Sequence, residues 1–119
     1  MGIKWNQELF GVEIKYDANH FVVSAQPSMV MDWDDAVRFY KDNKVWHLPT
    51  RKQLLLIANN IDEINTIIKA NGGYEIRSGW YRTDDECDEF CAWYVHMYGG
   101  YTSYNLKSLG SYVRAVSNL

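Results

Sequence analysis

The chain has few of the features that would assign it to a functional class. It contains only two cysteines, Cys87 and Cys91, among 119 residues. Two cysteines are too few for a four-ligand structural zinc site, and no histidine lies at ligand spacing beside them. Their C-x-x-x-C spacing also differs from the C-x-x-C of redox motifs. Free thiols, a local disulfide, and a metal or redox role all remain open for the pair.

The chain also lacks an excess of positive charge and a long hydrophobic run. Its net charge of −3 provides no basic surface, which argues against a nucleic-acid partner. No apolar run approaches the roughly 18 residues that a membrane-spanning helix needs. The N-terminus lacks the charged and then apolar layout of a signal peptide. We therefore expect a cytoplasmic protein by default, or a surface or secreted one if a leader has been removed.

No familiar catalytic motif is present. The sequence contains no G-x-S-x-G, no Walker loop and no dinucleotide-binding glycine pattern. The three histidines, His20, His47 and His96, are far apart and lie in no metalloprotease-like arrangement, so structural or surface roles are expected for them. We expect no cofactor and no bound metal, and catalysis is the minority hypothesis.

Aromatic residues, in contrast, are abundant. The chain has five Trp and nine Tyr, and 47% of its residues are hydrophobic. Aromatic side chains bury large areas, while Trp and Tyr retain a polar group for a solvated edge. A chain of this length can bury its own core without metal or disulfide support, so residues 1–119 are interpreted as one domain.

Capping residues predict two consecutive helices in the middle of the chain. Thr50 follows Pro49 and forms a T-x-x-Q capping box with Gln53. A second capping box, from Asn60 to Glu63, predicts a kink into another helix. Glycines 72 and 73 supply the positive-φ conformation that ends it.

Hydrophobic periodicity places strands on both sides of the helices and indicates an α+β domain. The terminal strand is expected to return beside the first hairpin. The expected elements are a hairpin of 9–16 and 20–25, helices from Trp33 to Asp42 (capped by Asp32), from Thr50 and from Asn60, and strands at 79–83, 92–98, 104–108 and 111–117.

Several short motifs occur in an order that resembles a known family. They are Trp33-x-x-Ala36, Trp46-x-Leu48-Pro49-Thr50, Ile64-Asn65 to Ile68, Gly72-Gly73, Ala92-Trp93, Lys107 and the terminal Tyr112-Val113-Arg114-Ala115-Val116. Together they resemble a bacterial domain family of unknown function with a C-type-lectin-like fold. That family also occurs at the C-terminus of collagen-like surface adhesins. It is distantly similar to formylglycine-generating proteins and to the variable receptor proteins of diversity-generating retroelements.

The resemblance implies a C-type-lectin-like α+β fold, with helices packed on a twisted antiparallel sheet and long loops. It covers about Phe10 to Val116. One segment departs from the family, whose members usually read Tyr-Trp-Ser-Ser-Thr at the central strand where this chain reads Trp80-Tyr81-Arg82-Thr83-Asp84. Any role of the family's small polar pair is therefore in doubt at this position.

Neither calcium motif of true C-type lectins is present. Gln26-Pro27-Ser28 is the nearest string, but it lacks the acid, and Ca²⁺ needs six to eight oxygen ligands. The acidic stretch from Asp84 to Glu89 has no EF-hand spacing. A solvated acidic face is the favoured interpretation of that stretch, and a weak divalent-cation site is the alternative. Lys107 and Arg114 are expected to pair with an acidic residue such as Asp84 or Glu86, with an anionic ligand as the alternative.

The best candidate binding surface is tyrosine-rich and follows Trp93. If Trp93, Val95 and Met97 point inward, the residues alternating with them point outward together. Tyr, Ser, Gly and Asn are also typical of evolved binding surfaces. The candidate ligand-binding residues are Tyr94, His96, Tyr98, Tyr101, Tyr104 and Asn105.

The leading hypothesis is a non-catalytic module that binds a glycan or a protein through this surface. An enzyme-like relative of formylglycine-generating proteins and a structural or oligomerisation domain are the alternatives. Packing within the monomer and contact in a homo-oligomer are the competing roles for the tyrosines.

Overall fold

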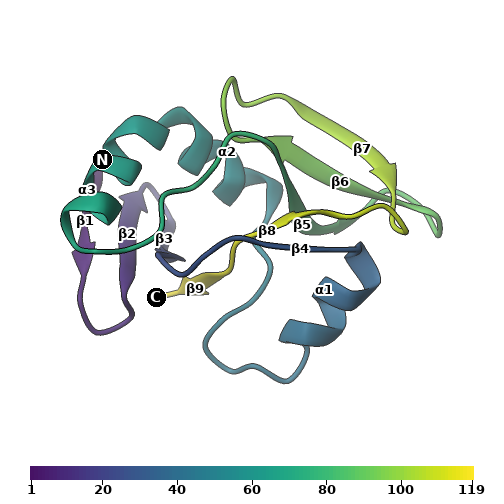
Figure 1. Ribbon diagram of the computed structural model, residues 1–119, viewed down its shortest axis with the longest axis horizontal. Helices are drawn as coiled ribbons and strands as arrows, with labels where there is room; N and C mark the ends of the chain where they lie inside the picture. The colour runs from purple at the N-terminus through teal and green to yellow at the C-terminus, as the bar shows by residue number, and fades with distance from the viewer.

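Three helices and two β-sheets make up the structure, a computed structural model that describes residues 1–119 (Figure 1). The first sheet has the strand order β1-β2-β3-β9 and the second β4-β8-β5-β6-β7. This arrangement confirms the predicted α+β class. The elements are β1 (Gly2–Asn6), β2 (Gly11–Tyr16), β3 (Asn19–Ser24), β4 (Met29–Met31), α1 (Trp33–Tyr40), α2 (Arg51–Asn59), α3 (Ile61–Ala70), β5 (Trp80–Glu86), β6 (Cys91–His96), β7 (Thr102–Leu106), β8 (Ser111–Val113) and β9 (Val116–Asn118).

The first sheet holds the two ends of the chain together. Strands β2 and β3 form the predicted hairpin, whose turn contains Asp17 at a φ of 52°. Strand β9 pairs antiparallel with β3, with Val23 opposite Val116, so the predicted return to the hairpin is confirmed for the chain end. The single strand predicted at 111–117 is wrong, because its first half forms β8 in the second sheet. Strand β1, which was not among the predicted strands, pairs with β2 on the other side. Alternation of Ile3 and Trp5 was the available signal for it.

The helices begin largely as their capping residues predict. Thr50 Oγ1 accepts a hydrogen bond from Gln53 N at 3.1 Å, and Gln53 Oε1 accepts one from Thr50 N at 3.0 Å. The capping box predicted at Asn60 is wrong, because Asn60 makes no side-chain cap to α3. Its amide instead donates to the carbonyl of Leu56 at 2.8 Å. Asn60 alone separates α2 from α3, so its side chain is used to end the first of them.

One continuous hydrophobic core joins both sheets through α2 and α3. Helix α3 packs on β1 and β2, whereas α2 packs on β5 and β6. The core cluster draws residues from both sheets and both helices, including Phe21, Ile64, Ile68, Tyr81 and Val95, all fully buried. Each fully buried side chain of this size stabilises the folded state by about 1.5–3 kcal/mol relative to an exposed one.

Helix α1 lies beside the other end of the second sheet, over a smaller core cluster. Ala36, Tyr40 and Leu48 pack there with Val113 and Ala115. The first glycine of the pair that follows α3, Gly72, has the expected positive φ of 77°, while Gly73 does not. No helix in the structure is both long enough and apolar enough to cross a bilayer.

Replacing Thr50 by alanine should lower the free energy of unfolding by about 1 kcal/mol, because the backbone N–H of Gln53 loses its acceptor, Thr50 Oγ1. Urea denaturation of the two proteins measures the difference. Thr66→Ala is the matched control, since Thr66 is exposed within α3 and alanine has the higher helix propensity. An equal loss in both variants would contradict the capping role.

Candidate functional site

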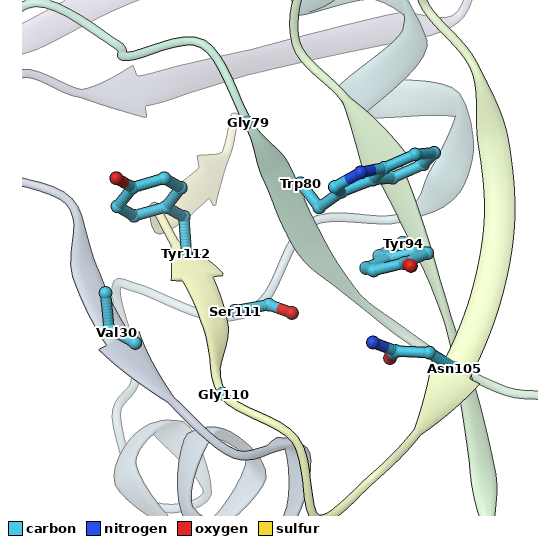
Figure 2. Close-up of a pocket in the computed structure, with 8 residues that line it drawn as sticks. All are labelled: Val30, Gly79, Trp80, Tyr94, Asn105, Gly110, Ser111 and Tyr112. Atoms are coloured by element: carbon cyan, nitrogen blue, oxygen red, sulfur yellow. The ribbon is translucent and has the colours of Figure 1, made fainter.

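A pocket of about 380 Å³ opens between the central strands and β8 (Figure 2). Its lining comes from five strands and two glycines, and no lining side chain is charged at neutral pH. The lining residues are Val30, Gly79, Trp80, Tyr94, Asn105, Gly110, Ser111 and Tyr112. Apolar walls with a few polar groups are typical of small-molecule sites.

A stack of side chains forms one wall of the pocket. The rings of Trp80 and Tyr94 lie 4.2 Å apart at an interplanar angle of 21°. The Arg82 guanidinium lies 5.6 Å from the centre of the Tyr94 ring. His96 contacts the Trp80 ring edge to face, at 5.1 Å. Cross-strand register explains the arrangement, because Trp80 is opposite His96 and Arg82 is opposite Tyr94.

Tyr112 forms the facing wall, and two neighbours hold it in place. Its ring stacks on that of Tyr81 at 5.3 Å. The buried Tyr81 hydroxyl accepts a hydrogen bond from Arg77 N at 3.1 Å and contacts Ser28 Oγ at 3.0 Å. Gly79 has a φ of 141°, and a Cβ there would lie 2.7 Å from the Tyr112 ring. Glycine is therefore required for this wall to close.

Arg82 sets the orientation of the polar group at the pocket floor. Its Nη1 donates to Asn105 Oδ1 at 2.7 Å, and its Nη2 donates to the carbonyls of Leu106 at 2.9 Å and Leu109 at 2.5 Å. A guanidinium has no acceptor, so the Asn105 oxygen must face it. The Asn105 Nδ2 therefore turns away from Arg82, and Figure 2 shows it on the pocket side.

Burial makes this arginine costly to keep charged. Its side chain is fully buried, and its Nε has no hydrogen-bond partner. Desolvation lowers the pKa of Arg82 below its ordinary value, and no carboxylate hydrogen-bonds to it. Three neutral acceptors and the Tyr94 ring compensate for the lost water.

The predicted binding residues divide between this pocket and other surfaces. Tyr94 and Asn105 line the pocket, and His96 supports its Trp80 wall. Tyr104 lies on the opposite face of the sheet, because it pairs with Trp93 and contacts that ring at 5.2 Å. The alternation of a strand forces this separation of Tyr104 from Asn105.

The other two tyrosines are exposed outside the pocket. Tyr98 is 41% exposed and Tyr101 is 68% exposed. Tyr98 lines a neighbouring hollow of about 650 Å³ that shares Tyr112 and Val30 with the pocket. The six residues therefore do not form one continuous surface. Val95 and Met97 are fully buried, as the alternation predicted, and Trp93 is partly buried.

The two predicted cations differ in their partners. Lys107 Nζ lies 2.5 Å from Glu86 Oε2, which confirms the expected ion pair. The prediction for Arg114 is wrong, because its hydrogen bonds go to Ser28 Oγ and three backbone carbonyls. Burial lowers the pKa of Arg114 to about 10. The Arg114 guanidinium is thus surrounded by neutral acceptors and contacts no carboxylate.

The histidines and cysteines remain outside the pocket lining. His47 hydrogen-bonds locally to the Leu48 carbonyl at 3.1 Å, and His20 to Glu13 at 2.9 Å. Both cysteines are free and lie where the hairpin of β5 and β6 turns. In the acidic stretch, Asp85 pairs with Arg51 at 2.9 Å.

Sequence reasoning missed Trp80, Ser111 and Tyr112 as pocket residues. Each lies in a predicted strand, but their meeting depends on β8 lying parallel to β5, with Tyr81 opposite Tyr112. Arg82 was noticed only as a departure from the family pattern. The strand reads Trp-Tyr-Arg-Thr-Asp-Asp-Glu and carries several charges, so no sequence signal marked Arg82 as the buried one.

Comparison with known proteins adds no assignment, since no family model and no curated protein matches this chain.

Replacing Arg82 by lysine should lower the free energy of unfolding by about 1–3 kcal/mol, because buried carbonyls lose their donors. Lysine offers one point charge where arginine spans three acceptors. Urea denaturation measures the loss. Arg77→Lys is the matched control and should stay within about 0.5 kcal/mol, since the Arg77 side chain is exposed. An Arg82→Lys protein with an unchanged free energy of unfolding would contradict the structural role of Arg82.

Proposed function

We propose that this chain is a non-catalytic binding module of C-type-lectin-like fold, whose pocket between Trp80 and Tyr112 holds one neutral sugar residue. Sugars present both apolar C–H faces and hydroxyl groups. The pocket offers aromatic walls together with the Ser111 hydroxyl and the Asn105 amide. This combination suits a sugar better than a purely apolar ligand, whose binding would leave those polar groups without partners.

The orientation of Asn105 is the observation that carries the proposal. Its oxygen is occupied by Arg82, so its Nδ2 presents two N–H groups toward the pocket. Asn105 is consequently held as a donor before any ligand arrives. Such preorganisation reduces the entropy lost on binding and favours ligands rich in acceptor oxygens.

Charge argues for a neutral sugar within the glycan class. The pocket lining contains no Lys, Arg, Asp or Glu. The nearby cation of Arg82 is fully buried and already donates to three acceptors. A sulfate or carboxylate on the sugar would therefore find no free positive partner in this pocket.

Binding in this pocket should not require calcium. The string nearest a lectin calcium motif contains Ser28, whose Oγ contacts Tyr81 and accepts a hydrogen bond from Arg114 at 3.0 Å. It is part of an internal network and lies outside the pocket lining. The pocket lining has no carboxylate, whereas Ca²⁺ sites commonly contain several.

The topology supports the C-type-lectin-like part of the proposal. The chain ends are joined by β3 and β9, and two helices pack between that sheet and the rest. The order of the short sequence motifs, which resembles that of the family over most of the chain, also supports this class of fold. This fold-level argument supports the class of module, whereas the ligand is argued from the pocket.

A protein ligand is the second candidate, and the exposed tyrosines favour it. Tyr101, Tyr104 and Leu106 leave large aromatic or apolar areas in solvent, at 68%, 56% and 48% exposure. A partner or a second copy of the chain that covers them would contact β7, the edge strand of the second sheet. That surface is distinct from the pocket, so mutations separate the two possibilities.

A glycan array of neutral and sulfated sugars tests the proposal, followed by calorimetric titration with the best neutral monosaccharide. We expect binding that persists in EDTA. Asn105→Asp should weaken it at least roughly fivefold, because aspartate keeps the bond to Arg82 but removes the donor. Ser111→Ala should weaken it by a similar factor.

Two controls make the result decisive. Ser108→Ala, at an exposed turn position, and Tyr101→Ala should leave the sugar affinity unchanged. The sugar proposal fails if no neutral glycan binds, or if Tyr101→Ala abolishes binding while Asn105→Asp does not. Light scattering on the same variants detects an oligomer that depends on Tyr101.

A further inference from the structure

The tip of the β5–β6 hairpin gathers three groups that bind metals. Cys87, Asp88 and Cys91 have their sulfur and carboxylate oxygen atoms within 4.8 Å of one another. Cys87 is exposed and Cys91 partly buried, so a solvated ion can reach them. None of these three residues lines the proposed sugar pocket, so this site is independent of the proposed sugar binding.

Strand pairing explains why the sulfur atoms of Cys87 and Cys91 lie close together. Glu86 pairs with Ala92, so the next residues along each strand, Cys87 and Cys91, face one another across the hairpin. A hydrogen bond from Cys87 N to the Cys91 carbonyl, at 3.0 Å, closes the tip. The C-x-x-x-C spacing is therefore the spacing of a cross-strand pair on a three-residue turn.

The third ligand is already oriented. Asp88 Oδ1 accepts hydrogen bonds from the backbone N–H groups of Phe90 and Cys91, both at 2.8 Å. Bonds of this kind fix a metal-ligating carboxylate and tune its strength. Asp88 lies between the two cysteines in sequence, so one short turn supplies all three ligands.

We propose that Cys87, Asp88 and Cys91 form a surface site for a thiophilic divalent cation such as Zn²⁺ or Cd²⁺, with water as the remaining ligand. Tetrahedral coordination at a Zn–S length of about 2.3 Å places two sulfurs roughly 3.8 Å apart. The three ligand atoms lie within 4.8 Å of one another, so the two sulfurs need to approach by about 1 Å at most. On binding, each thiol releases its proton to solvent as its sulfur becomes a metal-bound thiolate.

The surroundings favour a cation over an anion and a soft metal over a hard one. Five carboxylates lie between residues 84 and 89, and they raise the local concentration of cations. Glu86 is already paired with Lys107, so it is excluded from the ligand set. Two thiols and one carboxylate supply too few oxygens for Ca²⁺ and too much sulfur for Mg²⁺.

Titration of the fully reduced protein with Cd²⁺ under nitrogen tests this site through thiolate-to-cadmium charge-transfer absorption. We expect the band to saturate at one equivalent. Each single variant, Cys87→Ser or Cys91→Ser, should reduce its intensity per bound ion to about half, and the double variant should abolish it. Asp88→Asn should keep the intensity but weaken the affinity at least roughly tenfold.

Glu89→Gln is the matched control, because it removes a neighbouring charge but none of the proposed ligands. Its affinity should remain within about threefold of the parent. Circular dichroism verifies that every variant is folded. The proposal is overturned if the reduced protein shows no charge-transfer band, or if Asp88→Asn binds Cd²⁺ as tightly as the parent. A pair that forms a disulfide in air but gives no band when reduced also overturns it.

Discussion

The structure depends on a buried arginine at the point where the chain crosses between its two sheets. Arg114 lies between β8, in the second sheet, and β9, in the first. It is 3% exposed, and its guanidinium donates to the carbonyls of Ser24, Tyr74 and Glu75 and to Ser28 Oγ. These acceptors belong to the end of β3 and to two loops, so one side chain joins segments far apart in sequence. An uncompensated buried charge would cost several kcal/mol, which explains why the surrounding carbonyls converge on it.

Arg82 is buried in the same way on the second sheet, and the pocket between Trp80 and Tyr112 depends on it. Both guanidiniums donate only to neutral acceptors, and no carboxylate hydrogen-bonds to either side chain. The pocket above Arg82 can therefore be free of acidic residues while still having a rigid polar floor. The charge of Arg82 is used to orient Asn105, and it also contacts the face of Tyr94. A pocket with aromatic walls and a fixed amide donor is the chemical result.

Local features of the fold could be predicted because their causes are local. The Thr50 capping box and the hairpin of β2 and β3 both follow from residues a few positions apart. The box at Asn60 failed because the motif ignores the preceding helix, whose last turn uses that side chain. The candidate site was predicted only in part, with Tyr94 and Asn105 in the pocket. Grouping Tyr104 with Asn105 was wrong, because adjacent residues of one strand face opposite sides of the sheet.

By itself, the sequence determined the class of fold, the helix starts, the return of the last strand to the first hairpin, and an aromatic C-terminal half without charged motifs. Only the tertiary structure decided which aromatic side chains lie next to one another. Trp80, Tyr94 and Tyr112 share a pocket because of the register between β5 and β6 and the parallel contact of β8 with β5. It also decided that Cys87 and Cys91 face one another across a turn. Strand register and order arise from packing across the whole chain, and a change of one residue in register reverses the face of every side chain.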